Sequence, residues 1–204
     1  MIVKRYVLGE LATNTYLLID EKTKEAAVID PADEAELLRH EIESEGVTLR
    51  YILLTHGHRD HTLAAPRMHE LYPEALVYIH EKDKGQVGIY HYTMEEQIGA
   101  DLRFYRDGDT LELGSLTIEV IETPGHTGGC VCLKCGDTLF TGDTLFAGSM
   151  GRIDLPGAQP DKMMSSLRRL ADLPGDYKVC PGHMGTSTLE QERRTNMYLK
   201  MLDA

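Results

Sequence analysis

The sequence predicts an α+β fold in which two β-sheets pack face to face and helices cover their outer surfaces. Two observations support this fold class. First, the chain has two similar halves, and each half contains short strands followed by a helix. Second, no Pro/Ser-rich linker or low-complexity tract separates the halves, and 204 residues of ordinary globular composition suit one sizeable core. We therefore expect a single domain over residues 1–204.

Short apolar runs between turn signals predict the strands of the first half. These runs cover residues 2–8, 15–19, 26–29, 51–54 and 75–79, and the polar stretch 81–100 is left unassigned. The run 51–54 is apolar throughout, which suits a strand buried on both faces. Two helices are also expected, one through Ala35, Leu38 and Ile42 at helical spacing and one over residues 63–71.

The second half repeats this order of strands and then helix. Its predicted strands cover residues 110–113, 116–121, 177–180 and a pair within 129–140 that is joined by a Gly-Asp turn. Met163, Leu167 and Leu170 form an apolar stripe that predicts a helix. Ser187 and Glu190 fit a capping box, so a final helix is expected to begin there and to run to the end of the chain.

Charge and composition argue against several classes of partner. The formal net charge is -12 at pH 7, which argues against nucleic acid because phosphate binding needs clustered Lys and Arg. No apolar run reaches the length of a membrane span, and the N-terminus has no cationic segment that leads into an apolar stretch. We expect a cytoplasmic protein with no membrane partner, and its oligomeric state is left open.

Four cysteines, Cys130, Cys132, Cys135 and Cys180, are expected to be reduced and buried. Cys132 and Cys135 have the C-x-x-C spacing that occurs in zinc sites and redox motifs. A structural zinc site would need a second ligand pair at a matching spacing, and Cys180 alone does not provide one. The pattern of residues 129–140 instead predicts two strands that bury the thiols as small apolar groups.

Three histidines and an aspartate lie together directly after the buried run 51–54. They are His56, His58, Asp60 and His61, in the order H-x-H-x-D-H. Imidazole and carboxylate groups suit zinc and similar divalent ions. In extended backbone His56 and His58 point the same way, whereas Asp60 and His61 lie past the bend and can face a neighbouring ion. One histidine here would be an ordinary loop residue, but the group indicates a shared ligand.

Three later loops supply further donors, and each loop follows a predicted strand. They contain His126 in Thr-Pro-Gly-His-Thr, Asp143 in Thr-Gly-Asp-Thr and His183 in Cys-Pro-Gly-His. Taken alone, each loop is an ordinary turn, and Asp143 fits an Asx-turn. Together they complete a set of five histidines and two aspartates at strand ends, where a rigid scaffold can hold functional side chains. The sequence thus predicts a metal site.

The order H-x-H-x-D-H, followed by H, D and H in separate loops, resembles the metallo-β-lactamase superfamily over nearly the whole chain. The resemblance implies a four-layer αββα sandwich that binds two divalent metal ions. It places His56, His58 and His126 on one ion, Asp60, His61 and His183 on the other, and Asp143 as a bridge between them. Zinc is the expected metal, with iron and manganese as alternatives, and Asp60 is also the expected catalytic residue.

The segment 142–154 resembles the glyoxalase II group, and its short bacterial members most of all. His58 separates the chain from the flavo-diiron proteins, a redox branch that carries an acidic residue at this position. The resemblance implies hydrolysis of a small-molecule thioester, such as the glutathione-derived S-lactoylglutathione, by attack of a metal-bound hydroxide. Full-length glyoxalase II enzymes have a C-terminal helical domain that contacts glutathione, whereas this chain ends at Ala204, so the thiol is left open.

Other activities are compatible with the same residues. A persulfide dioxygenase would hold a single Fe(II) on two histidines and a carboxylate, and His56, His126 and Asp143 could form that set. A lactone hydrolase would direct the same hydrolytic chemistry at an oxygen ester. A non-enzymatic scaffold stabilised by metal is the remaining alternative, although structural zinc sites are typically closed and rich in cysteine.

Arg152 lies in the loop after Asp143, where glyoxalase II relatives carry a basic residue near the glutathione moiety. The resemblance therefore predicts that Arg152 binds a carboxylate of the substrate. A guanidinium suits this role because its planar fork matches a carboxylate, and a chain with net charge -12 needs local positive charge to attract an anion. The alternative is a structural salt bridge with nearby Asp154.

Overall fold

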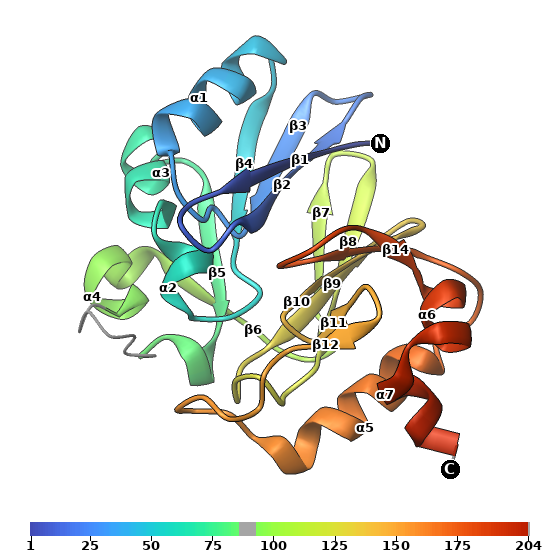
Figure 1. The fold of residues 1–204 in the computed structure, drawn as a ribbon. Helices are drawn as coiled ribbons and strands as arrows, with labels where there is room; N and C mark the ends of the chain where they lie inside the picture. The colour runs from blue at the N-terminus through green and yellow to red at the C-terminus, as the bar shows by residue number, and fades with distance from the viewer. Residues whose placement is uncertain (86–92, 204) are drawn as a thin grey trace.

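The computed structural model describes residues 1–85 and 93–203. Within these residues two six-stranded β-sheets face each other, and helices lie on both outer sides (Figure 1). None of the described helices has the length and apolar character that crossing a membrane requires.

The first sheet comes from the N-terminal half and has the strand order β1-β2-β3-β4-β5-β6. Its strands are β1 (Ile2–Leu8), β2 (Thr13–Asp20), β3 (Glu25–Ile29), β4 (Thr48–Leu53), β5 (Leu76–His80) and β6 (Leu102–Tyr105). Its helices are α1 (Ala35–Ser44), α2 (Arg59–Thr62), α3 (Ala65–Leu71) and α4 (Met94–Ile98), with the 3₁₀ turns η1 (Glu81–Asp83) and η2 (Gly99–Asp101). Strands β3 to β6 are parallel, so their carboxyl ends meet at one edge of the sheet.

The second sheet comes from the C-terminal half and has the order β14-β13-β10-β9-β8-β7. Its strands are β7 (Thr110–Leu113), β8 (Leu116–Glu122), β9 (Val131–Cys135), β10 (Thr138–Gly142), β13 (Lys178–Pro181) and β14 (Ser187–Thr188). A separate hairpin pairs β11 (Leu145–Phe146) with β12 (Ser149–Met150). The helical segments are α5 (Pro160–Ala171), α6 (Leu189–Thr195), α7 (Met197–Lys200) and η3 (Met201–Asp203).

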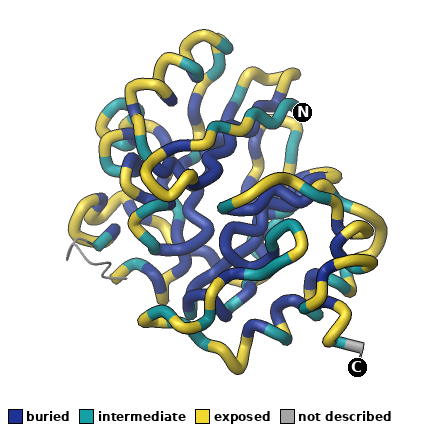
Figure 2. The backbone as a smooth tube through the Cα atoms, viewed as in Figure 1, coloured by how far each residue is buried: buried dark blue, intermediate teal, exposed yellow. Residues whose placement is uncertain are grey.

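Strand β2 shows how the layers are built, because all of its residues are buried. Leu17 and Ile19 belong to the apolar cluster that α1 and α3 cover, whereas Tyr16 and Leu18 belong to the cluster between the sheets. Alternate side chains therefore face opposite layers, as the two-residue period of a strand requires. A third cluster lies between the second sheet and α5 to α7, and the tube in Figure 2 is darkest along the strands. These layers confirm the predicted αββα sandwich.

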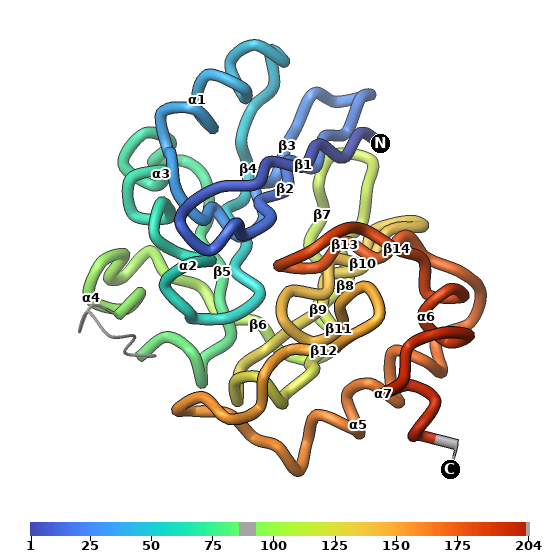
Figure 3. Tube along the Cα trace, in the orientation of Figure 1, coloured from blue at the N-terminus to red at the C-terminus, as the bar shows by residue number. Residues whose placement is uncertain are grey.

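The predicted strands are largely confirmed, and β1 and β7 match the expected ranges 2–8 and 110–113 residue for residue. Strand β6 and the hairpin β11–β12 are not predicted by the sequence patterns. Their strands have four and two residues, too few for a period of two to be distinguished from chance. Figure 3 traces this hairpin on the same side of the molecule as β13 and β14.

The prediction of the C-terminal helix is wrong in two respects. The helix is capped by Thr188, whose hydroxyl accepts from Gln191 N at 3.2 Å, because Ser187 pairs within β14 and directs its own hydroxyl to Glu192. The helix also ends at Thr195. Asn196 has ψ 120° and begins α7, with its side chain accepting a hydrogen bond from the first turn of that helix at 3.0 Å.

All four cysteines are free and buried, as expected. Cys135 and Cys180 pack between the two sheets, and Cys132 packs under the C-terminal helices. No group of potential metal ligands found in residues 1–85 and 93–203 contains a cysteine. The packing interpretation of these thiols therefore agrees with the structure.

Asp20 joins the two sheets at the end of β2. Its carboxylate accepts hydrogen bonds from Ser115 N at 2.6 Å, in the turn between β7 and β8, and from Thr23 Oγ1 at 2.9 Å. These donors, Ser115 first, hold the pKa of Asp20 below its usual range. Gly114 approaches this contact so closely that a Cβ atom there would overlap Thr23 Oγ1 and Asp20 Oδ2.

We expect Gly114→Ala to destabilise the protein more than Gly46→Ala. Both glycines have φ +61°, so either substitution places alanine in the left-handed region at a cost of about 1 kcal/mol. Nothing lies within 4 Å of a Cβ at Gly46, whereas a Cβ at Gly114 meets the Asp20 contact. The free energy of unfolding in urea should fall by about 1 kcal/mol for Gly46→Ala and by about 2 to 4 kcal/mol for Gly114→Ala. Equal losses would contradict the close contact at Gly114.

Candidate metal centre

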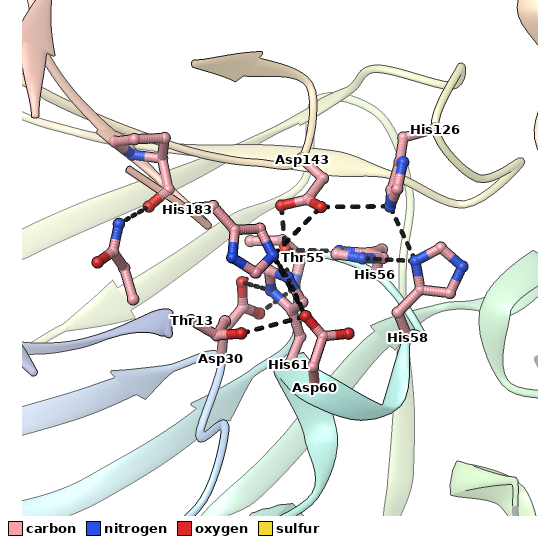
Figure 4. Close-up of polar contacts among 12 residues, drawn as sticks. Thr13, Asp30, Thr55, His56, His58, Asp60, His61, His126, Asp143 and His183 are labelled. Carbon is pink, nitrogen blue, oxygen red and sulfur yellow. Dashed lines mark hydrogen bonds and ion pairs between the residues drawn. The ribbon is translucent and has the colours of Figure 1, made fainter. Parts of the chain in front are cut away.

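Seven histidine and aspartate side chains converge at the edge of the sandwich where β4, β10 and β13 end (Figure 4). They are His56 after β4, His58, Asp60 and His61 at and within α2, His126 in the loop between β8 and β9, Asp143 after β10 and His183 after β13. The structure thus brings together all seven residues that the sequence predicts as metal ligands. The edge is shared by both sheets, so neither half of the chain forms the cluster alone.

His56, His58 and His126 form a first triad. Nδ1 of His58 lies 3.1 Å from Nε2 of His56 and 2.8 Å from Nε2 of His126. His56 and His126 are buried, and His58 is partly exposed. One donor atom from each ring lies within 4.8 Å of the other two, so the triad has the size of a coordination site for one ion.

Asp60, His61 and His183 form a second triad. Nε2 of His183 lies 3.2 Å from Oδ2 of Asp60 and 3.3 Å from Nε2 of His61. Asp143 lies between the triads, with Oδ2 at 3.3 Å from His126 Nε2 and Oδ1 at 3.3 Å from His61 Nε2. Oδ2 also lies 3.6 Å from His183 Nε2, so the carboxylate of Asp143 contacts both triads, as a bridging ligand would.

Hydrogen bonds on the outer side of two rings determine which nitrogen faces the centre. His126 Nδ1 lies 2.7 Å from the carbonyl oxygen of Arg152, which can only accept, so Nδ1 carries the proton. His61 Nδ1 lies 2.8 Å from the carboxylate of Asp30 and donates in the same way. With Nδ1 protonated in this way, the nitrogen that each ring turns to the centre is Nε2.

The same conclusion holds for His56 through one further step. Thr55 Oγ1 lies 2.7 Å from Asp30 Oδ2 and must donate its single proton to that carboxylate. The 3.2 Å contact between Thr55 Oγ1 and His56 Nδ1 therefore has the imidazole as its donor. His56 consequently also presents an Nε2 lone pair inward, whereas His58 approaches with Nδ1.

Burial and neighbouring imidazoles keep His56 and His58 neutral. Burial, followed by the proximity of His126, lowers the pKa of His58 to about 4. Complete burial, followed by the proximity of His61 and His126, lowers the pKa of His56 well below its usual range. Both rings are therefore uncharged near pH 7 and have lone pairs available to an ion.

In the second triad the pKa values of the histidines are raised, in contrast to those of His56 and His58. Asp143 and Asp30 raise the pKa of His61 well above its usual range despite burial, and Asp60 raises that of His183. The imidazoles in turn hold the pKa of Asp60 and of Asp143 below the usual range, although burial acts against this. A divalent cation would have to displace protons from these histidines, so its binding should release protons and weaken in acid.

The donor atoms are arranged as a cation would require. Oδ1 of Asp143 is buried and accepts no hydrogen bond from the part of the chain that the structure describes. In the first triad, Nδ1 of His58 lies 3.1 Å from Nε2 of His56 and 2.8 Å from Nε2 of His126, and the rings of His56 and His126 carry their protons on the outer side. A cation between these atoms could be coordinated by all three nitrogens when His58 carries its proton on Nε2. Imidazole and carboxylate donors suit zinc, iron or manganese.

Two buried aspartates that the sequence patterns do not single out support the centre from strands on either side of β4. Asp30 follows β3 and accepts from His61 Nδ1 and from Thr55 N at 2.7 Å. Asp83 lies in η1 after β5 and accepts from Gly57 N at 2.9 Å. Their only sequence signal is an aspartate just after an apolar strand, which is also typical of turns.

Strand β2 holds the second triad in place. Thr13 Oγ1 donates to Asp60 Oδ2 at 3.1 Å. Asn14 Nδ2 donates to two backbone carbonyl groups in the loop of His183, at 2.8 and 2.9 Å. The first sheet therefore orients a ligand that belongs to the second sheet, and this contact spans the edge of the sandwich.

Glycine is required beside two of the predicted ligands because a side chain there would overlap neighbouring atoms. A Cβ atom at Gly182 would overlap Asp143 Oδ1 and His61 Cε1, so only glycine allows this loop to pass the centre. Gly142 has φ +46°, and a Cβ there would overlap Thr55. The Gly-rich character of these loops thus follows from close approach of backbone to the ligand side chains.

The backbone of Arg152 lies beside the centre, but its side chain is engaged elsewhere. The guanidinium forms two 2.9 Å hydrogen bonds with Asp154, and both side chains are about two-thirds exposed. The salt bridge that the sequence suggests as the alternative is therefore present. An exposed pair of this kind contributes little stability, so the guanidinium can exchange its partner for a substrate carboxylate. Binding of substrate by Arg152 stays a prediction.

Comparison with known proteins identifies the family. The profile of the metallo-beta-lactamase superfamily matches residues 8–183. The chain belongs to this superfamily. It is similar to an uncharacterized protein of Mycobacterium leprae, with 35% identity over 99% of this chain and 100% of the relative. It is also similar to the hydroxyacylglutathione hydrolase GloC of Haemophilus influenzae, with 34% identity over 89% of this chain and 91% of the relative.

Solved structures have the same superfamily fold. BLEG-1 B3 metallo-beta-lactamase has a TM-score of 0.85 at 30% identity and covers 97% of this chain and 99% of its own. ETHE1 from Myxococcus xanthus has a TM-score of 0.83 at 28% identity, with coverages of 100% and 90%. TTHA1623, solved in a di-iron-bound form, has a TM-score of 0.81 at 34% identity, with coverages of 97% and 100%. Fold and donor clusters together identify a metallo-β-lactamase-fold metal hydrolase.

We expect Gly182→Ala to impair metal binding while Gly185→Ala does not. The added methyl group at Gly182 would push Asp143 and His61 apart, whereas nothing lies within 4 Å of a Cβ at Gly185 in the same loop. Zn²⁺ affinity, measured by competition with a chromophoric chelator, should fall at least about tenfold for Gly182→Ala. Unchanged affinity in a folded Gly182→Ala protein would contradict the close approach of this loop to the ligands.

Proposed function

We propose that this protein is a dinuclear metal hydrolase that cleaves small-molecule thioesters of the S-lactoylglutathione type. The observation that carries the proposal is that two complete triads are formed with Asp143 between them. A hydrolase with two ions needs both triads, whereas a scaffold with one structural ion would need a single closed site. The relative named hydroxyacylglutathione hydrolase supports the thioester as substrate.

Each residue has a definite role in this proposal. His56, His58 and His126 would hold one ion, Asp60, His61 and His183 the other, and Asp143 would contact both. When bound, paired divalent ions polarise the acyl carbonyl and make a water molecule nucleophilic at neutral pH. A thiolate is a good leaving group and needs little help from a general acid, which suits a centre built from ligands alone.

Asp60 is the proposed catalytic carboxylate. It is the acidic ligand with the greater exposure, at 23% of its side chain against 8% for Asp143. Thr13 and His183 fix Oδ2, and His183 holds the pKa of Asp60 below its usual range despite burial. Asp60 therefore remains ionised near pH 7 and can accept a hydrogen bond from a water molecule at the edge of the centre.

Persulfide oxidation at a single iron is the second candidate. A donor atom of His56 lies within 4.8 Å of one from His126 and of one from Asp143, and His126 Nε2 lies 3.3 Å from Asp143 Oδ2, so the three residues could form a two-histidine, one-carboxylate site. The structural similarity to ETHE1 covers the whole chain. The second triad favours hydrolysis, because a single-iron enzyme would leave Asp60, His61 and His183 without an ion. Lactones are an alternative substrate class for the same hydrolytic centre.

Elemental analysis of freshly purified protein, combined with assays on the same preparation, tests the proposal. We expect two equivalents of divalent metal per chain and hydrolysis of S-lactoylglutathione. One equivalent of iron, with oxygen uptake on glutathione persulfide and no thioester cleavage, would replace the proposal with the dioxygenase. Inactivity toward thioesters, lactones and persulfides with metal fully bound would favour a scaffold.

We expect His58→Ala and Asp143→Ala each to remove nearly all thioesterase activity from a protein that still folds. Loss of one ligand disrupts the paired ions, and kcat should fall on the order of 10³-fold. The sandwich has its own apolar core, so circular dichroism of both variants should match the parent protein. His40→Ala, at an exposed position on α1, is the control and should be fully active. Parent-like turnover in either variant would remove that residue from the ligand set.

We expect Arg152→Ala to weaken kcat/KM for S-lactoylglutathione about ten- to a hundredfold, because a charged hydrogen bond to a substrate carboxylate is lost. Lysine should restore only part of the loss, since an ammonium lacks the planar fork. Asp154→Ala is the matched control, because it frees the guanidinium and should maintain or improve kcat/KM. If Arg152→Ala and Asp154→Ala instead lower the melting temperature equally and leave kinetics unchanged, the pair is purely structural.

A further inference from the structure

Asp83 is a buried carboxylate outside the set of seven ligands. It lies at the end of η1, directly after β5, and only 1% of its surface is exposed. The turn that carries it is anchored at its start, since His80 Nδ1 accepts from Lys82 N at 3.2 Å and His80 Nε2 lies 3.0 Å from Glu122 Oε1. Asp83 therefore occupies a rigid position between the ends of β5 and β8.

One oxygen of Asp83 holds two loops together. Asp83 Oδ2 accepts from Gly57 N at 2.9 Å and from Thr127 Oγ1 at 2.6 Å. Gly57 separates His56 from His58, and Thr127 follows His126. The two hydrogen bonds therefore connect the loops that carry the three members of the first triad.

The fit around Asp83 is close. A Cβ atom at Gly129 would overlap the carboxylate, so the loop after His126 packs directly against it. Thr127 is itself fully buried and also accepts from Gly129 N at 3.3 Å. Small displacements of Asp83 would therefore be transmitted to the backbone on both sides of the first triad.

Asp30 has the corresponding position on the other side of β4. The strand order β3-β4-β5 places Asp30 after one neighbour of β4 and Asp83 after the other. Asp30 binds His61 of the second triad, together with Thr55 at the start of the ligand motif. The hydrogen bonds of Asp83 among the described residues go to Gly57, between two members of the first triad, and to Thr127, next to the third.

We infer that Asp83 is a positioning residue that preorganises the first triad without acting on the second, so that the affinities of the two metal positions are set separately. This inference rests on the proposed dinuclear centre. Its physical basis is that a ligand set held in place before binding loses less conformational entropy when the ion arrives. A carboxylate that fixes two ligand loops supplies that constraint, and partners of this kind alter metal affinity about 10- to 100-fold.

Stepwise metal binding tests the inference. Apo-protein is titrated with Zn²⁺ against a chromophoric chelator, which gives two dissociation constants, and anomalous scattering from crystals at one equivalent of Zn²⁺ identifies the occupied position. Asp83→Asn should weaken binding at the first triad about 10- to 100-fold and leave the second within about twofold. Asp30→Asn should weaken binding at the second triad in the same assay.

A second pair of variants maintains the test if Asp83→Asn does not fold. Thr127→Val removes the hydroxyl that donates to Asp83 and should lower Zn²⁺ affinity at the first triad about tenfold. Thr127→Ser retains the hydroxyl and should keep the affinity of the parent protein. Equal weakening of both positions, or no change, in a folded Asp83→Asn or Thr127→Val protein would overturn the inference. The variants could instead weaken Zn²⁺ binding at the first triad only, while the parent protein fails to hydrolyse S-lactoylglutathione. That result would refute the proposed thioesterase activity and leave the inference on Asp83 intact.

Discussion

The hydrogen bonds on the outer nitrogens of His56, His61 and His126 are the interaction on which the centre depends. Each bond keeps a proton on Nδ1, away from the centre, and directs Nε2 inward. Without them the rings could rotate or change tautomer and present N–H groups to one another. The acceptors are a backbone carbonyl, a threonine hydroxyl and a buried carboxylate, so the arrangement is fixed by the main chain and the core together.

The sandwich explains why the centre lies where it does. Parallel strands β3, β4 and β5 end at one edge of the first sheet, and β10 and β13 end at the matching edge of the second. Groups that follow these strands necessarily meet, and the contacts of Asn14 and Thr13 join the two sheets at this edge. Asp20 joins them at the opposite end of β2. The relative position of the sheets is thus held at both ends of one strand.

The convergence of the seven side chains could be predicted from the sequence because four of them lie within six consecutive positions. Three histidines and an aspartate within six positions, followed by further donors in Gly-rich loops, form a pattern that is typical of a metal site. The patterns did not predict Asp30 or Asp83, because a lone aspartate after a strand looks the same whether it ends a turn or supports a ligand. They also did not predict the break between α6 and α7 at Asn196. This break depends on a tertiary contact, because the Asn196 side chain donates to Ser149 O at 3.0 Å in the β11–β12 hairpin. Local periodicity contains no information on such long-range partners.

The spacing of the donors along the chain also affects how metal and folding are linked. Four of the seven lie between residues 56 and 61, and the other three are spread out to residue 183. In the unfolded chain the four neighbouring donors can still chelate an ion together, whereas the three remote donors are too far away to contribute. Because an ion that also binds the denatured ensemble stabilises the native state less than its native affinity suggests, metal should raise the melting temperature only modestly relative to that affinity. The compact motif that makes the site recognisable thus limits how strongly its ions can protect the fold.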